Sequence, residues 1–125
     1  MLFRSGTKKI WRVGGGLVGV AGDIAAMLQF IRWIKCGSDV DDWPKFNGCF
    51  HAMCVSPTGK ISLFEDSGPE SCEMHGSYCA IGSGSDFALG ALACKQTARA
   101  AVRAAIKHHA QCKPPIRSYK LRGYE

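Results

Sequence analysis

The sequence has no apolar run long enough to cross a membrane and no segment of the kind that directs secretion. Spanning a bilayer takes about 18–20 consecutive apolar residues, and every apolar stretch here is shorter. Residues 1–6 also have too short an apolar run for a secretory signal. Repeats, low-complexity tracts and interdomain linkers are lacking as well. We therefore expect a cytoplasmic protein whose 125 residues form a single domain over residues 1–125.

Complete nucleotide-binding motifs are absent, although one glycine-rich turn is present. The turn Gly82–Ser85 joins an apolar segment to an Ala/Leu-rich segment, and many phosphate sites begin with such a turn. The Walker spacing with its lysine and the full G-x-G-x-x-G pattern are both missing. We therefore expect no nucleotide cofactor.

Paired Cys-x2-Cys knuckles are also missing, although the chain has seven cysteines. An odd number of cysteines without a secretory signal argues against a disulfide framework. Two interpretations remain, and the favoured one is that the cysteines are structural thiols, so that no metal is bound. The other is a zinc site drawn from Cys49, His51, Cys54, Cys72, His75 and Cys79.

The apolar periodicity predicts short strands in runs that are separated from runs of helices. We expect a polar loop over residues 65–76 and helices over 23–36, 86–95 and 98–109. The expected strands cover residues 9–13, 17–21, 50–55, 60–64, 77–81 and 116–121. This order predicts an α+β protein with antiparallel sheets.

Three side-chain placements follow from the same patterns. Trp43 and Phe46 are expected to dock on the body of the protein, and Thr97 is expected to cap the last helix. The inward stripe of the first helix is expected to comprise Ile24, Met27, Leu28, Ile31 and Ile34. The inward stripe of the last helix is expected to comprise Ala101, Val102, Ala105 and Ile106.

The order of several motifs resembles that of β-type proteasome subunits. The motifs are Thr7–Val13, a glycine turn, Leu17–Asp23, an amphipathic helix, and the turn Ile81–Gly84 with its helix. The chain is most similar to the bacterial peptidase HslV and to short proteasome-like proteins of phages and prophages. The resemblance implies a sandwich of two antiparallel sheets between helices, ring assembly, and cleavage of peptides by an N-terminal threonine.

The resemblance also assigns three site residues. It places the lysine that tunes the nucleophile at Lys9, the oxyanion-binding N–H at Gly19, and the serine that supports the threonine amine at Ser83. Each residue also has a structural interpretation. Lys9 suits a solvated strand end, Gly19 a bulge or close packing, and Ser83 a turn or helix cap.

The chain departs from the family at its start. Only residues 1–7 precede Lys8, whereas the family has two strands and an aspartate before the lysine motif. We therefore expect an N-terminally truncated sandwich that lacks its first β-hairpin and is inactive as given. It is either a truncated reading frame or a degenerate pseudoenzyme. An unpaired sheet edge then predicts a homo-oligomer or a completing partner. The resemblance adds an unfoldase as another partner.

A different class of function is a non-catalytic basic binding module. Lys95, Arg99, Arg103 and Lys107 recur every four residues, and residues 95–125 contain eight Lys/Arg against one acidic residue. If the helices there are continuous, these cations line one face that contacts nucleic acid or an acidic protein partner. The alternative explanation is an ordinary solvated helix face. Few aromatic residues interleave the stripe, which disfavours stacking on single strands.

Overall fold

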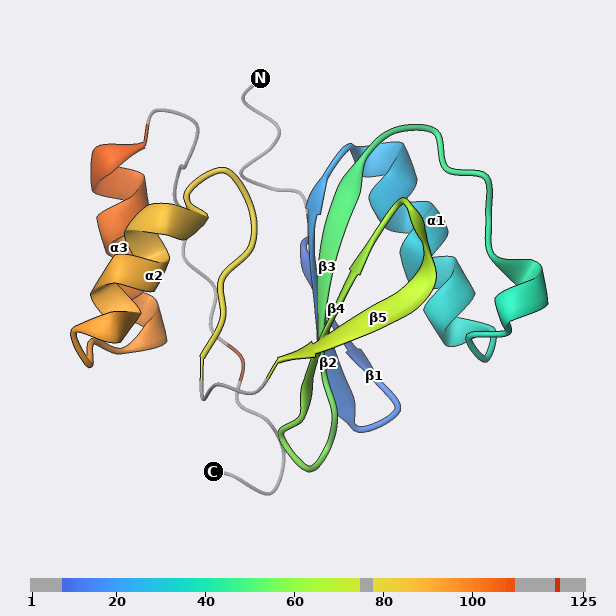
Figure 1. The fold of residues 1–125 in the computed structure, drawn as a ribbon, viewed down its shortest axis with the longest axis horizontal. Coiled ribbons are helices and arrows are strands. Elements are labelled where there is room, and N and C mark those ends of the chain that lie inside the picture. The colour runs from blue at the N-terminus through green and yellow to red at the C-terminus, as the bar shows by residue number, and fades with distance from the viewer. Residues whose placement is uncertain (1–7, 75–77, 110–118, 120–125) are drawn as a thin grey trace. The chain divides into compact units, whose positions relative to one another are not determined.

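A computed structural model describes residues 8–74, 78–109 and 119 of the chain (Figure 1). The chain divides into two units, and each is described by itself. We call described residues 9–74 the sheet unit and described residues 78–109 the helical unit. The predicted α+β class is confirmed, whereas the single domain over residues 1–125 stays a prediction.

The sheet unit contains five antiparallel strands that are neighbours in chain order, β1-β2-β3-β4-β5. Their bounds are β1 (Ile10–Val13), β2 (Gly16–Gly22), β3 (Phe50–Val55), β4 (Ile61–Glu65) and β5 (Gly68–Met74). The strands predicted over residues 9–13, 17–21, 50–55 and 60–64 form close to those bounds, and they pair as two hairpins, β1–β2 and β3–β4. Pairing of Ile10 with Gly19 sets the register of β1 and β2, and pairing of Val18 with Cys54 sets that of β2 and β3.

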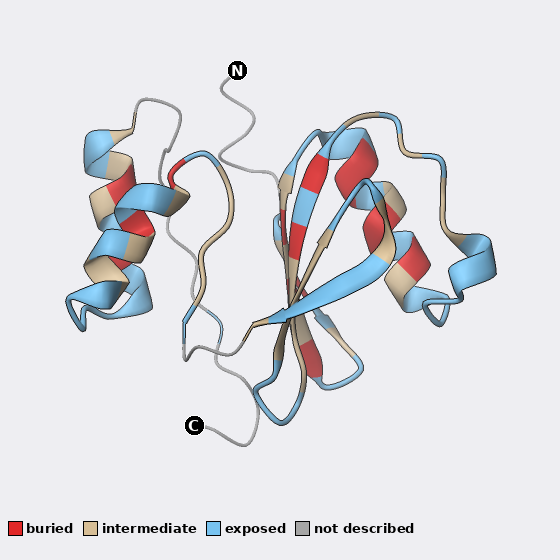
Figure 2. Ribbon diagram, in the orientation of Figure 1, coloured by how far each residue is buried: buried red, intermediate tan, exposed pale blue. Residues whose placement is uncertain are grey.

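Helix α1 (Ile24–Lys35) packs against one face of this sheet. Alternation along β2 buries Val18 and Val20 on that face, while Leu17, Gly19 and Ala21 are half-buried. Figure 2 shows the buried residues concentrated on α1 and on the strands. The core comprises Trp11, Val18, Val20, Ala26, Met27, Phe30, Ile31, Trp33, Phe50 and Ala52.

The predicted inward stripe of α1 is only partly right. Met27 and Ile31 are buried, but Ile24 is 41% exposed and Leu28 is 51% exposed. The buried face instead includes Phe30 and Trp33, because aromatic side chains from the following loop cover them. The ring of Trp43 packs edge-on at 4.7 Å from that of Trp33, and Phe46 lies 4.6 Å from Phe50, measured between ring centroids.

The docking of Trp43 and Phe46 is confirmed, since both pack against the core. Their loop includes a short 3₁₀ helix, η2 (Val40–Asp42), and is tied to α1 by side chains. The Gln29 amide donates to the carbonyl of Lys45 at 3.2 Å and accepts from the N–H of Asn47 at 2.9 Å. Hydrogen bonds from both the nitrogen and the oxygen of the Gln29 amide fix the path of the loop.

Asp23 immediately precedes α1, whose helix was predicted to begin at residue 23, but its side chain does not cap the helix. Its Oδ2 accepts instead from the N–H of Cys49 at 2.9 Å, and its own N–H donates to the carbonyl of Cys49 at 2.9 Å. The side chain therefore joins the start of α1 to the start of β3.

The predicted loop over residues 65–76 is wrong, because residues 68–74 form β5. Pairing with β4 places Met74 opposite Ile61 and Cys72 opposite Leu63. The loop was predicted because the segment contains Pro69, Glu70 and Glu73. Proline and charged residues are typical of loops, but they are also typical of edge strands such as β5. The strand predicted over 77–81 is also wrong within its described part, 78–81. The strand predicted over 116–121 lies outside the described residues, apart from Tyr119, which is not in a strand.

The helical unit pairs α2 (Ser85–Ala93) with α3 (Ala98–His108). The predicted cap of α3 is confirmed, since the Thr97 hydroxyl accepts from the N–H of Ala100 at 3.1 Å. Ala101 and Ala105 are buried as predicted, but Val102 is 42% exposed and Ile106 is half-buried. Within the described part of the chain, no helix is long and apolar enough to cross a membrane.

Candidate functional site

The β1–β2 hairpin brings Lys9 and Gly19 together. Lys9 immediately precedes β1, and its carbonyl accepts from the N–H of Val20 at 2.9 Å. Ile10, the next residue, lies opposite Gly19 in the register. Two residues that are ten positions apart in sequence are therefore neighbours at one end of the hairpin, with the Lys9 side chain exposed.

The three glycines of β2 differ in how much room their surroundings leave for a side chain. A Cβ at Gly16 would lie 2.3 Å from the carbonyl oxygen of Val55, so that position excludes a side chain. Gly22 has a φ of +133°, and a Cβ there would lie 2.4 Å from the carbonyl oxygen of Cys49. A Cβ at Gly19 would meet only the carbonyl oxygen of Lys9, at 4.0 Å. Packing within the chain therefore explains Gly16 and Gly22 but not Gly19.

Ser83 lies in the turn that leads into α2, and its side chain is exposed. Gly82 has a φ of +99°, and its carbonyl accepts from the N–H of Ser85 at 3.1 Å, which closes the turn. The N-cap of α2 is Gly84, with no side-chain cap, so neither serine caps the helix. Ser83 belongs to the helical unit, and the structure establishes proximity only for Lys9 and Gly19.

The described threonines both have local structural roles. The Thr58 hydroxyl is 3.0 Å from the Ser56 hydroxyl in the β3–β4 turn, and Thr97 caps α3. Thr7 lies outside the described residues. Neither described threonine has a free α-amine beside its hydroxyl, which an N-terminal nucleophile requires.

The candidate zinc ligands do not converge within the described part of the chain. Residues 8–74, 78–109 and 119 contain no group of three or more His, Cys, Asp or Glu side chains placed to hold a metal ion. Cys49 and Cys72 are exposed, and His51 Nε2 instead faces Glu65 Oε2 at 3.6 Å. His75 lies outside the described residues. Cys54 packs against the core, and burial raises the pKa of its thiol to about 11.

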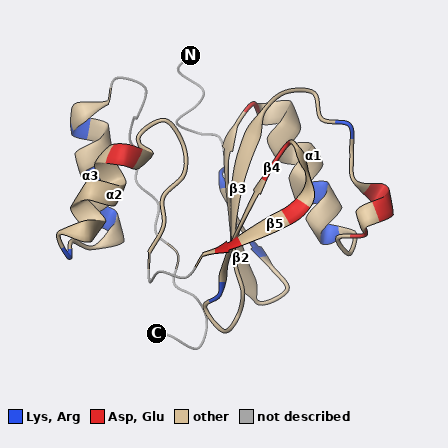
Figure 3. Cartoon of the chain, viewed as in Figure 1, with Lys and Arg blue, Asp and Glu red and all other residues tan. Residues whose placement is uncertain are grey.

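The basic stripe is shorter than a continuous helix would make it. Helices α2 and α3 do not form one continuous helix. Lys95 lies in the turn between them, with a φ of +63°. Arg99, Arg103 and Lys107 are exposed on α3 at four-residue spacing (Figure 3). The helical face therefore carries three of the four predicted cations.

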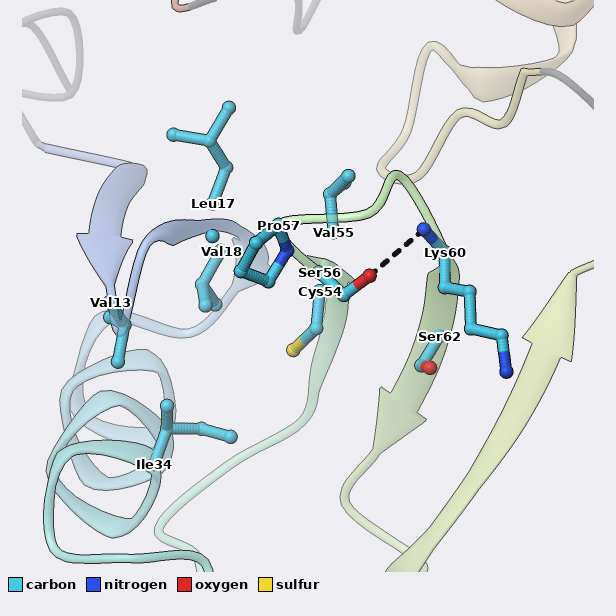
Figure 4. Close-up of a pocket in the computed structure, with 11 residues that line it drawn as sticks. Val13, Leu17, Val18, Ile34, Cys54, Val55, Ser56, Pro57, Lys60 and Ser62 are labelled. Carbon is cyan, nitrogen blue, oxygen red and sulfur yellow. Dashed lines mark hydrogen bonds between the residues drawn. The ribbon is translucent and has the colours of Figure 1, made fainter. Parts of the chain in front are cut away.

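A pocket in the sheet unit was not predicted from the sequence. It has a volume of about 190 Å³ and lies where the β1–β2 and β3–β4 hairpins meet the last turn of α1 (Figure 4). Its lining comprises Val13, Gly16, Leu17, Val18, Ile34, Cys54, Val55, Ser56, Pro57, Lys60 and Ser62. Its residues come from five elements and the β3–β4 turn, so no local motif could have identified it.

Comparison with known proteins yields similarity at the level of structure alone. No family model matches the chain, and no curated protein matches it. Among solved structures, the chain is similar to Thiobacillus denitrificans BPH in complex with epoxomicin, with a TM-score of 0.67 and 20% sequence identity. The match covers 90% of this chain and 78% of that chain. At this identity the likeness shows the fold, which is proteasome-like and α+β.

Proposed function

We propose that this chain is a proteasome-like β-type subunit of the N-terminal nucleophile hydrolase class. In this proposal, its β1–β2 hairpin supplies the lysine and the oxyanion-binding N–H of a threonine peptidase site. The observation that carries the proposal is the proximity of Lys9 to Gly19, a glycine that packing within the chain does not require. Gly19 lies next to Lys9 across the hairpin, and its missing Cβ leaves room for a bound backbone. The proteasome-like fold of the solved neighbour supports the same class.

The chemistry follows from charge placement. A threonine hydroxyl is activated when the adjacent free α-amine, with an ordinary pKa of about 7.7–8.0, accepts its proton. An ammonium at Lys9 would favour the protonation pattern that leaves the nucleophile active. A backbone N–H at Gly19 would stabilise the oxyanion that forms on the substrate carbonyl, and Ser83 would support the threonine amine.

Peptidase activity in this proposal depends on a threonine other than the three in residues 1–125. We expect residues 1–125 not to hydrolyse peptides, and we expect a version extended by a threonine-led β-hairpin to do so. An in-frame threonine, two strand-like segments and an aspartate encoded upstream of Met1 would distinguish a truncated reading frame from a degenerate one. Hydrolysis by residues 1–125 without threonine dependence would contradict the proposed class.

The site residues are tested in the extended, active version with fluorogenic peptides. Lys9→Ala is expected to lower kcat/KM by about 10²–10³-fold, the usual effect of losing one well-placed electrostatic group. Lys35→Ala, at the exposed end of α1, is the matched control and should leave the rate unchanged. An active extended chain that tolerates Lys9→Ala would show that the lysine is assigned wrongly.

Gly19→Ala separates a site role from a structural one. A methyl group at position 19 meets only ordinary contact within the chain, so urea unfolding should change little. The same methyl would crowd a bound substrate backbone, so kcat/KM should fall. Gly68→Ala is the matched control, because a Cβ there meets nothing within 4 Å and the residue lies outside the hairpin. Equal activity of both variants would remove Gly19 from the site.

The second candidate is the basic binding module, which is favoured by the exposed cations at four-residue spacing on α3. Contacts of Arg103 and Lys107 with phosphates would make affinity fall steeply with salt. Labelled DNA and RNA titrated at low salt would reveal such binding. No binding to either nucleic acid, and none to an acidic peptide, would exclude this class.

A further inference from the structure

The pocket between the two hairpins and α1 has apolar walls. Val13, Val18 and Ile34 contribute aliphatic side chains from β1, β2 and the last turn of α1. Pro57 extends the apolar lining at the β3–β4 turn, whereas the side chains of Leu17 and Val55 point away from Val18 and Ile34 (Figure 4). A small cavity with such walls favours an apolar group over water, because water there finds few hydrogen-bonding partners.

The Cys54 thiol adds no charge to this lining. Cys54 lies on β3 beside Val18, its pair on β2, and it is half-buried. Because burial raises the pKa of this thiol to about 11, it is neutral at physiological pH. An anionic ligand would therefore meet no repulsion from this part of the pocket.

The polar side of the pocket carries one ammonium group and two hydroxyl groups. Lys60 immediately precedes β4, Ser62 is the second residue of that strand, and both line the pocket (Figure 4). Ser56 Oγ already accepts from the N–H of Lys60 at 3.0 Å. The Lys60 ammonium faces Glu73 at 3.5 Å, but the two side chains are 71% and 48% exposed. An ion pair so exposed is weak, so the ammonium is able to turn to a ligand anion.

We propose that this pocket binds an aliphatic chain that ends in a carboxylate. The chain lies among Val13, Val18 and Ile34, and the carboxylate pairs with the ammonium of Lys60. Both a medium-chain fatty acid and the apolar C-terminal residue of a peptide have this chemistry. The inference is independent of the peptidase proposal, since it uses neither Lys9 nor Gly19.

The volume sets the size and the affinity of the ligand. A pocket of about 190 Å³ suits octanoate, which has about ten non-hydrogen atoms. At the low end of the efficiency of small ligands, about ten atoms give a dissociation constant of about 6 mM, and better contacts give a lower one. Binding at this level is measurable by titration with NMR detection.

The test follows methyl resonances of the full chain as octanoate is added. Binding is expected to shift the methyls of Val13, Val18 and Ile34 together, with one dissociation constant. Lys60→Met keeps the apolar stem and should weaken octanoate about threefold to fivefold, as expected for one exposed ion pair. The same variant should leave octan-1-ol binding unchanged, and the control Lys35→Met should leave both ligands unchanged. Ser62→Phe should fill the pocket and abolish binding of both.

The same titration distinguishes the two sources and can overturn the proposal. An Ala-Ala-Leu peptide with a free carboxylate, compared with its C-terminal amide, tests the peptide source. A shift with octanoate alone identifies a fatty acid, and carboxylate-dependent shifts with the peptide identify a C-terminus. The proposal is wrong if neither ligand shifts these methyls at 10-fold the expected constant. It is equally wrong if folded Lys60→Met binds octanoate as tightly as the parent chain.

Discussion

Burial acts on individual residues of this chain mainly by removing water from apolar groups, and Cys54 shows its effect on ionisation. The thiol packs against the core from β3, and desolvation disfavours the thiolate. Cys49 and Cys72 are exposed by contrast. Cysteines of one sheet unit therefore differ in chemistry because of where the strands place them.

The raised pKa of Cys54 predicts a defined pH dependence. The pKa rises from 9.0 to about 11 on folding, so between these values the unfolded chain has lost a proton that the folded chain keeps. Stability from this group is fully present below pH 9 and is lost as pH rises toward 11, by about 1–2 kcal/mol after allowance for partial exposure. Cys54→Ala should flatten urea-derived stability over this range. An unchanged slope would contradict the assignment.

Single elements of the chain depend on a few polar contacts at their ends. Helix α3 has no acidic residue in its first turn, and Thr97 supplies its side-chain cap. Helix α1 relies instead on packing, since the Asp23 carboxylate accepts a hydrogen bond from the N–H of Cys49 and does not cap the helix. Loss of a cap should therefore affect α3 directly.

Thr97→Ala is expected to destabilise the helical unit by about 1 kcal/mol, the usual effect of removing a threonine N-cap. Thr97→Ser keeps a hydroxyl in place and should retain most of that stability. Urea unfolding followed by circular dichroism measures both variants. Equal losses in the two variants would show that the methyl group, and not the hydrogen bond, stabilises α3.

Across the whole molecule, exposed apolar surface predicts self-association. Ile24 and Leu28 are four residues apart on α1, so they form one exposed apolar stripe. We expect an oligomer at micromolar concentration, and the double variant Ile24→Lys, Leu28→Lys should shift it toward the monomer. Sedimentation velocity measures this. A parent chain that stays monomeric throughout this range would rule out the prediction, and Val40→Lys on η2 is the control for an added surface charge.

The sequence by itself determined the features that depend on local periodicity and turn chemistry. Alternation and glycine turns located the first two hairpins, and the Thr97 pattern located α3. A two-residue period and a tight turn bring Lys9 beside Gly19, so their proximity follows from the hairpin, whereas their proposed roles rest on the family resemblance. Ser83 was predictable as a turn residue from its place in the glycine-rich segment.

Tertiary contacts decided what local patterns leave open. The rotation of α1 depends on Trp43 and Phe46, which lie beyond the helix and select Phe30 and Trp33 as its buried face. Strand β5 exists because β4 offers it hydrogen-bonding partners, whatever its own charged composition suggests. The pocket around Cys54 likewise arises only where separate hairpins and a helix end meet. Each of these features rests on contacts between residues distant in sequence, and no local pattern specifies which partner a side chain will find.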